Sequence, residues 1–369
     1  MSATSDSGRW KALLFIALAQ LMVVLDTTVV NIAMPSAQFD LGMSDGDRQW
    51  IIAADALPFG SLLLFGGRVA DVAGRKRTFI GGLVGFGVAS LIGGAAINGE
   101  MLIAARAMQG TSGALLAPAA LALVTMTFTD AAERAKAFGI YSAIAGSGGA
   151  VGLILGGVVT EYLNWRWSMY ISVPIAAIAA LGAVAVVRER AEHRNRGGLD
   201  LPGAVLATVG LVCLAYAFAP ADSDGWTAPG TIGMFVASAV LVVVFVAVEA
   251  RAAAPLLPPR VVADRNRGGV YLALGLAVIS MFGLLLFLTY YLQVVKGYSP
   301  IVTGLAFLPM VVSLVAGSTQ IAGRLPRVAP RQLMGWGFVA AAVGMLLLTQ
   351  LELDSSYLSL VLPAEVLLG

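Results

Sequence analysis

Charged residues, cysteine and histidine are all scarce in this sequence. Only 12% of its 369 residues are Asp, Glu, Lys or Arg, against about 25% in a typical soluble domain. Cys213 is the one cysteine, so the chain has no internal disulfide and no thiolate metal site. His193 is the one histidine, which argues against metal clusters and histidine-based catalytic triads. We therefore expect no enzyme activity, no metal and no other cofactor.

Apolar residues, by contrast, make up 59% of the chain and occur in long runs. A helix needs about 20 mostly apolar residues to cross about 30 Å of hydrocarbon. Such runs lie near residues 11–34, 49–67, 78–97, 101–127, 137–160, 167–187, 202–220, 230–249, 269–292, 301–322 and 332–351, and a twelfth begins near 357. Backbone groups in lipid must be hydrogen-bonded within their own segment, and the runs lack the alternation of a β-barrel. The sequence therefore predicts an all-α polytopic membrane protein.

Lysine and arginine gather in every second loop. Nineteen of the 23 lie at the N-terminus or in loops that follow even-numbered runs. These are Arg9, Lys11, Arg68, Arg75, Lys76, Arg77, Arg134, Lys136, Arg188, Arg190, Arg194, Arg196, Arg251, Arg260, Arg265, Arg267, Arg324, Arg327 and Arg331. The opposite loops carry only Arg48, Arg166 and Lys296. Because cytoplasmic loops are rich in Lys and Arg, we expect a multi-pass protein of the cell membrane with a cytoplasmic N-terminus. No soluble basic domain is present, so nucleic acid is not an expected partner.

The loop after the second run is repeated, in degraded form, after the tenth. Residues 67–77 read GRVADVAGRKR and residues 323–331 read GRLPRVAPR. A plain duplication of six helices would place the second copy after the eighth run, so two helices look inserted between the halves. Repeated halves are typical of secondary transporters. We predict an N-terminal six-helix half over 1–187, a basic loop with two inserted helices over 188–250, and an incomplete C-terminal half over 251–369.

Four motifs carry a resemblance to a known family. They are Leu25–Pro35 in the first run, the loop Gly67–Arg77, Arg106–Gly110 in the fourth run, and the glycine-rich fifth run with Trp165–Trp167. In these motifs the chain resembles the major facilitator superfamily, specifically its fourteen-helix drug:proton antiporters of EmrB/QacA type. The resemblance implies two pseudo-repeated helical halves with two inserted helices. It also implies proton-driven export of amphipathic drugs or toxic small molecules by alternating access, with the substrate, protons and the lipid bilayer as partners.

The chain departs from the family pattern in three places. Val72 stands where the family usually has arginine, Gly152-Leu153 where its antiporter motif has Gly-Pro, and Ser172-Val173-Pro174 where asparagine usually precedes the proline. Two alternatives stay open: export of an endogenous metabolite, and a truncated membrane relative that does not transport. A fourteen-helix pattern needs two helices beyond a twelfth that is cut off at Gly369, so we expect a C-terminally truncated fragment. The sequence assigns no role to Glu365 in that twelfth helix.

Three ionisable residues stand out inside predicted spans: Asp26, Asp55 and Arg106. A charge in a span costs about 2.5–3.5 kcal/mol on insertion scales, so a functional role is the default hypothesis. At 1.5 Å per residue their depths below the outer surface are about 12, 10 and 7–8 Å. An arginine favours the charged form of a nearby carboxylate and burial favours the neutral form, a balance that substrate could tip. We predict that these residues couple protons to substrate; a static salt bridge is the alternative.

The fifth run carries glycines at every fourth position, Gly148, Gly152 and Gly156. Residues at this spacing share one helix face, and small residues allow helices to approach closely. The face predicts either a sliding contact between the two halves or ordinary tight packing within the first half. The glycines alone do not separate these readings.

The loop Gly67–Arg77 places Asp71 four residues before Arg75, with Gly74 between them. Glycine permits a tight turn, and the two charges can pair with each other or with helix ends. The family resemblance implies a gating loop, formed by Gly67, Asp71, Gly74 and Arg75, that latches one state of the transporter. The alternative is that the loop's cations serve only to set topology.

Overall fold

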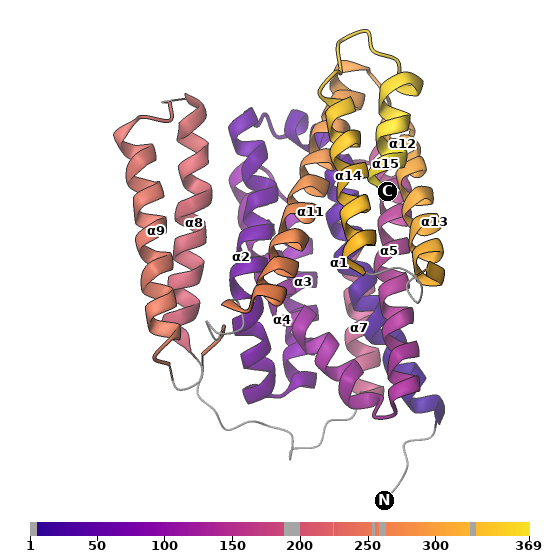
Figure 1. Cartoon of the computed structure of the whole chain (residues 1–369). Coiled ribbons are helices and arrows are strands. Elements are labelled where there is room, and N and C mark those ends of the chain that lie inside the picture. Colours follow the sequence, from indigo (N-terminus) through magenta and orange to yellow (C-terminus); the bar gives the residue numbers. More distant parts are fainter. Residues whose placement is uncertain (1–5, 188–199, 224, 253–254, 258–262, 325–329) are drawn as a thin grey trace, which may run out of the picture. The chain divides into compact units, whose positions relative to one another are not determined.

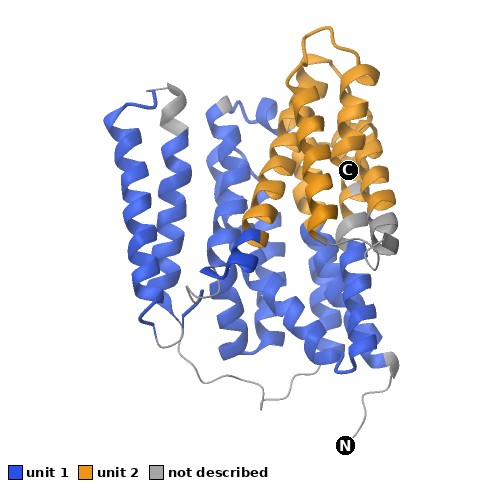
Figure 2. Ribbon diagram, viewed as in Figure 1, with its two compact units in different colours: residues 1–23, 37–144, 169–269 blue, residues 24–36, 145–168, 270–369 orange. Residues whose placement is uncertain are grey.

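A computed structural model of the chain is helical wherever ordered elements occur in the residues that it describes, 6–187, 200–223, 225–252, 255–257, 263–324 and 330–369 (Figure 1). The helices form two compact units (Figure 2). The first comprises residues 1–23, 37–144 and 169–269, and the second comprises residues 24–36, 145–168 and 270–369. The all-α prediction is confirmed. The division at residues 187 and 250 that we expected from the sequence stays a prediction.

The predicted spans coincide with helices. In chain order these are α1 Asp6–Asp40, α2 Asp45–Ala73, α3 Arg75–Gly94, α4 Gly99–Thr127, α5 Ala131–Tyr162, α6 Trp167–Tyr170, α7 Ser172–Val186, α8 Leu201–Ser223, α9 Pro229–Glu249, α11 Arg265–Tyr290, η2 Tyr291–Val295, α12 Pro300–Ala306, α13 Leu308–Arg324, α14 Pro330–Leu348, η3 Tyr357–Val361 and α15 Leu362–Leu368. Several helices begin before the apolar segment because a polar side chain caps their first turn. Ser44 and Asp47 form a capping box at the start of α2, and Asn98 accepts a hydrogen bond from the Met101 N–H at the start of α4.

Two predicted spans are interrupted. The sixth is divided at Ile171 into α6 and α7, and the tenth at Phe307 into α12 and α13. Pro174 and Pro309 follow these breaks, and proline has no N–H to donate to the carbonyl four residues earlier. The runs were apolar enough to predict helices, but the backbone interruption follows from the prolines.

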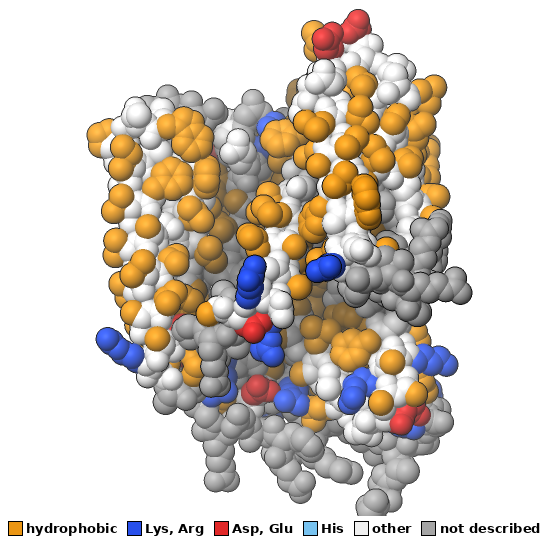
Figure 3. Space-filling view, in the orientation of Figure 1, with side chains coloured by type: hydrophobic (Ala, Val, Ile, Leu, Met, Phe, Trp, Pro, Cys, Tyr) orange, Lys and Arg blue, Asp and Glu red, His pale blue; other side chains and the backbone are white. Residues whose placement is uncertain are grey.

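Within the described residues, ten helices are long and apolar enough to cross a membrane. The shorter apolar segments Val151–Tyr162 and Tyr357–Leu368 add to these. On α9, exposed apolar side chains on different faces include Ile232, Met234 and Val244, and Figure 3 shows hydrophobic side chains along this helix. Apolar surface on several faces of a helix is typical of contact with lipid.

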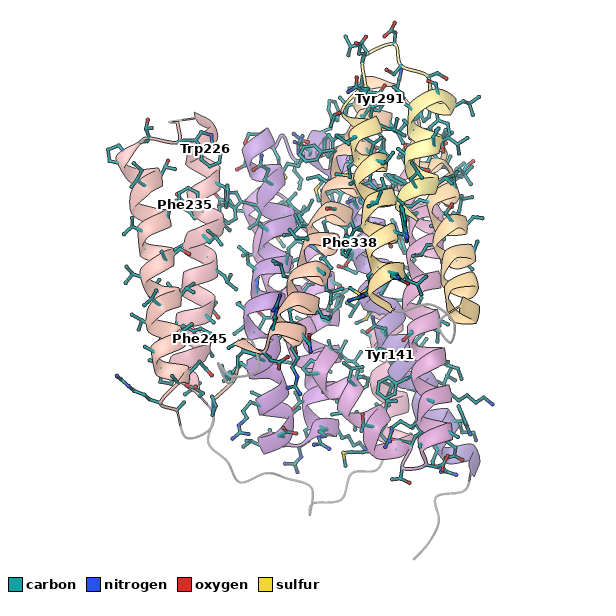
Figure 4. The ribbon with its side chains drawn as sticks, viewed as in Figure 1. Tyr141, Trp226, Phe235, Phe245, Tyr291 and Phe338 are labelled. Carbon is teal, nitrogen blue, oxygen red and sulfur yellow. The ribbon has the colours of Figure 1, made fainter. Side chains whose placement is uncertain are left out.

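Aromatic residues gather where α8 and α9 are joined. The rings of Trp226 and Phe235 stack with centroids 6.3 Å apart, and Phe218 meets both edge-on (Figure 4). Trp226 remains 65% exposed. Tryptophan at a span end is typical of the membrane–water interface, which agrees with the aromatic belt expected for a multi-pass protein.

Part of the evidence for orientation falls outside the described residues. Arg188, Arg190, Arg194, Arg196, Arg260 and Arg327 belong to this part of the chain. The cytoplasmic placement of the N-terminus therefore still rests on the sequence pattern.

Candidate functional site

An ion pair joins two of the three predicted site residues inside the first compact unit. Arg106 Nη2 of α4 lies 2.9 Å from Asp55 Oδ2 of α2, with side-chain exposures of 4% and 20%. Neither helix supplies another charge next to the pair, because residues 51–67 and 101–127 otherwise contain none. Two opposite charges at hydrogen-bond distance offset much of the cost of placing either one in an apolar span.

The ion pair continues into a polar chain that crosses from α4 to α3. Arg106 Nη1 donates to Gln109 Oε1 at 2.8 Å, and Gln109 Nε2 donates to Ser90 Oγ at 2.9 Å. The Ser90 hydroxyl then donates to the Phe86 carbonyl at 2.8 Å. Gln109 and Ser90 are fully buried, so this network, which we call the Arg106 network, links three helices through buried hydrogen bonds. The sequence contained Gln109 within a motif, but only the fold identifies Ser90 as its partner.

Gly110 explains why α2 and α4 come close enough for the ion pair. A Cβ at this position would overlap the backbone carbonyl of Asp55. Ala114 lies one turn beyond Gly110 on α4, and a Cβ at Gly66 of α2 would overlap its carbonyl in the same way. The Arg106–Gly110 motif therefore combines a charged side chain with the small residue that lets its partner helix approach.

Asp26 lies on α1 in the second compact unit and is 1% exposed. It is therefore deeply buried, as a coupling residue in a span would be. Asp55 and Arg106 belong to the first unit. The expectation that Arg106 acts on Asp26 stays a prediction.

The loop residues Asp71 and Arg75 also form an ion pair. Arg75 Nη2 and Nε lie 2.9 and 3.2 Å from Asp71 Oδ1, with side-chain exposures of 23% and 37% for Arg75 and Asp71. Gly74 ends α2 and precedes α3 with φ 106°, a backbone conformation that suits glycine. Gly67 lies in the last part of α2, where a Cβ would contact Pro118 of α4 at 3.6 Å.

The same loop reaches the end of α7. Lys76 Nζ donates to the Val184 carbonyl at 2.8 Å, within the last turn of that helix. A cation at a helix C-terminus is favourable because the terminal carbonyls carry partial negative charge. The loop thus holds together three helices of the first unit.

The glycine face of α5 packs on α1 within the second unit. A Cβ at Gly152 would overlap the Thr28 hydroxyl, and a Cβ at Gly156 would lie 2.9 Å from Val29 Cα. Gly148 on the same face is buried. Gly157, one position away, lies against Ile301 and Pro300 of α12. Gly152 and Gly156 therefore pack on α1 and Gly157 on α12, and the choice between a sliding contact and ordinary packing stays a prediction.

Polar contacts also join helices of this unit that are far apart in the sequence. Thr289 of α11 donates to Asn31 Oδ1 at 2.9 Å, and Gln293 Nε2 of η2 donates to the Ile32 carbonyl at 3.0 Å. The Ile301 N–H at the start of α12 donates to Glu161 Oε2 of α5 at 3.1 Å. Asn31 lay in a quoted motif, but its partner 258 residues away was not identifiable from the sequence.

Two acids interact where α8 begins and α9 ends. Glu249 is 2% exposed, and its Oε2 accepts a hydrogen bond from the Leu257 N–H at 2.8 Å. Its carboxyl also interacts with that of Asp200, whose Oδ1 accepts from the Gly203 N–H at 2.9 Å. The sequence alone does not pair these two acids, because Asp200 and Glu249 lie at opposite ends of the segment that forms the hairpin. Among the described residues, no group of three or more His, Cys, Asp or Glu side chains could hold a metal.

Comparison with known proteins shows that this chain is similar to membrane transporters. The sequence profile of the Major Facilitator Superfamily matches residues 16–369. The puromycin resistance protein pur8 of Streptomyces alboniger is 54% identical over 367 residues, which are 99% of this chain and 73% of that protein. The cephamycin export protein CmcT of Amycolatopsis lactamdurans is 40% identical over 361 residues, 97% of this chain and 74% of that protein. The crystal structure of the peptide transporter POT in complex with sulfate shares the fold, with a TM-score of 0.64 at 16% identity over 97% of this chain and 79% of that one.

Proposed function

Because this chain belongs to the major facilitator superfamily, we propose that it is a proton-driven exporter of amphipathic, antibiotic-like small molecules. The relatives support the substrate class. Their names describe resistance to puromycin in one case and export of cephamycin in another, and the similarity extends over nearly the whole chain. Lincomycin resistance in Streptomyces lincolnensis is a third such function, in a protein 34% identical over 373 aligned residues.

The observation that carries the proposal is the ion pair at 2.9 Å between the buried Arg106 and the half-buried Asp55. Charges inside spans are expensive and mark ion or substrate pathways. In this proposal Asp26, which is 1% exposed, carries the exchanged proton or binds a cationic group of the substrate. Asp55 and the Arg106 network hold the arginine in a fixed position within the first unit.

Alternating access requires contacts that form in one state and break in another. The links from Asn31 to Thr289 and from Glu161 to the Ile301 backbone join first-half to second-half helices. We propose that they belong to the gate on the outer side. The Asp71–Arg75 loop belongs to the cytoplasmic side, in accordance with the positive-inside rule.

Export is tested in inside-out membrane vesicles with radiolabelled puromycin. We expect the wild-type chain to accumulate puromycin when the vesicle interior is acidic and to lose it when a protonophore collapses the gradient. Vesicles without the protein are the control. Accumulation that persists without a proton gradient would refute proton coupling, and no accumulation of puromycin or ethidium would refute the substrate class.

Orientation is tested with two single-cysteine variants in a Cys213→Ser background. Gly46→Cys lies at the start of α2 and Ala132→Cys at the start of α5, and both positions are exposed. We expect a membrane-impermeant maleimide to label Gly46→Cys in intact cells and to label Ala132→Cys only after the cells are permeabilised. The reverse pattern would place the N-terminus outside.

A further inference from the structure

Glu365 of α15 is the most deeply buried acid in the described part of the second unit. The residue is 0% exposed, and its Oε1 has no hydrogen-bond partner among the described residues. Burial of a charged carboxylate without a partner is far more costly than burial of the neutral acid. The surroundings of this one side chain therefore need an explanation.

Glu365 lies at the interruption between α12 and α13. Because α13 begins at Leu308, the N–H of Met310 is in its first turn and has no acceptor four residues earlier within that helix. The Met310 backbone is hydrogen-bonded to the Glu365 carboxyl instead. The Ala306 carbonyl on the other side of the break accepts the Tyr357 hydroxyl at 2.6 Å. The side chains of Tyr357 and Glu365 thus replace the backbone bond that the break removes.

Tyr357 has a single hydroxyl proton, and the geometry decides where it goes. The 2.6 Å contact with the Ala306 carbonyl is much shorter than the 3.4 Å that separates the hydroxyl oxygen from Glu365 Oε2. With its proton donated to Ala306, the Tyr357 oxygen has a lone pair that faces Glu365. Only a protonated Glu365 can donate to that lone pair.

No cation balances Glu365 from the helices packed on it, within the described residues. The arginines of α13 and α14, Arg324 and Arg331, lie 14 residues from Met310 and 13 from Gly344, the positions that contact α15. These separations correspond to about 21 and 20 Å along the helices. The titratable groups near Glu365 are Tyr357 and, beyond it, Tyr298.

We propose that Glu365 is a proton-binding residue of the second half, which takes up a proton as a neutral acid bonded to Tyr357 and releases it when the helix break at Phe307 changes shape. This inference rests on the proposed proton-driven export. In the protonated form the carboxyl O–H donates to the Tyr357 oxygen. In the ionised form the carboxylate keeps the Met310 N–H at the positive end of α13. Tyr357 is a positioning residue.

Infrared spectroscopy of the purified full chain in lipid nanodiscs tests proton binding without any substrate. We expect a C=O stretch of a protonated carboxylic acid that disappears as pH rises, and that is missing from Glu365→Gln at every pH. The control is Glu352→Gln, which removes an exposed acid from the same unit and should keep the band. If Glu365→Gln loses no band, or if the band does not titrate, the proposal is overturned.

Tyr357→Phe keeps the acid and guards against a Glu365→Gln chain that fails to fold. We expect this variant to keep the titrating band at an altered frequency, because the carboxyl O–H loses its acceptor; an unaltered band would overturn the proposed bond. Proton-driven uptake of puromycin is measured in parallel, and Glu365→Gln should lose most of it while Glu352→Gln does not. Coupled uptake by Glu365→Gln at the wild-type level would overturn the role in export. If the wild-type chain takes up no puromycin, the proposed function fails, while the infrared band still decides whether Glu365 binds a proton.

Discussion

Asp55 of the first compact unit and Glu365 of the second are both acids in apolar segments. They differ in the groups that stabilise their carboxyls. Asp55 has the guanidinium of Arg106 at 2.9 Å, and the Arg106 network extends through Gln109 and Ser90 to the Phe86 carbonyl. Among the described residues, Glu365 has a tyrosine and one backbone group as partners and no arginine. A carboxylate beside an arginine is held in its charged form, whereas an isolated acid in an apolar site is stable when neutral. The difference separates a fixed ion pair from a group that can gain and lose a proton.

The largest expected effect on stability and export comes from removing Arg106, the cation of the ion pair in the first unit. Arg106→Ala removes the cation beside the half-buried Asp55 and one hydrogen-bond donor to Gln109. Breaking a fully buried ion pair from one side costs about 3–5 kcal/mol, and the 20% exposure of Asp55 places this pair below that range. We expect a large fall in the melting temperature in detergent and loss of export. Arg106→Lys keeps the charge but not the planar donor group, so it should be less severe.

A double mutant tests whether this loss comes from the orphaned acid. In Arg106→Ala/Asp55→Ala neither charge remains, so part of the thermal stability should return. If the double mutant is as unstable as the sum of the two single mutants, the two side chains do not act as a pair.

We expect a glycine-to-alanine substitution at a close helix contact to be more destabilising in the first unit than in the second. A Cβ at Gly110 would overlap the Asp55 backbone, which cannot move without shifting α2. A Cβ at Gly344 would meet the end of the Leu368 side chain at 2.9 Å and the Ala364 carbonyl at 3.0 Å. Overpacking costs about 1–3 kcal/mol, and we expect Gly110→Ala at the upper end and Gly344→Ala below it in thermal melting. Gly81→Ala, which faces open space, is the control; equal melting temperatures for all three would remove the close-approach argument.

The smallest effect on stability is expected at the exposed ion pair. Asp71→Asn breaks a pair whose partners are 23% and 37% exposed, and such pairs contribute less than about 1 kcal/mol. Membrane insertion should be unchanged because the loop arginines remain, but transport should fall as the balance of inward- and outward-facing states changes. Puromycin uptake is compared at equal expression, with Asp71→Glu as the control that keeps the charge. Wild-type uptake by Asp71→Asn would leave only a topological role for the loop.

The sequence predicted the spans and the family more completely than the site. The all-α membrane fold and the resemblance to the fourteen-helix drug antiporters of the major facilitator superfamily are confirmed, because both depend on long apolar runs and local motifs. Arg106 and Asp55 were identifiable by their cost in lipid, and the structure pairs them. Ser90 and Tyr357 were not, because a serine or a tyrosine in an apolar run has no distinctive cost, and its partner is set by helix packing.

The sequence contains a local signal for the helix interruption at Phe307, the proline at position 309, from which we did not predict a break. Pro309 interrupts the helix, and the Ala306 carbonyl and Met310 N–H at the break must find partners elsewhere. That the partners come from residues 357 and 365 depends on how α15 packs on α13, which no periodicity indicates.

The most direct test of the account is proton-coupled uptake of puromycin by Asp26→Asn. The amide keeps the size of the buried side chain and some of its hydrogen bonds but cannot titrate. Wild-type and variant chains are compared in inside-out vesicles with an acidic interior, and correct folding is verified by equal melting temperatures. Asp26→Glu, which moves the acid by one methylene, should retain partial activity. We predict that Asp26→Asn accumulates no puromycin under the gradient; accumulation at the wild-type level, with wild-type proton release on substrate addition, would contradict the account.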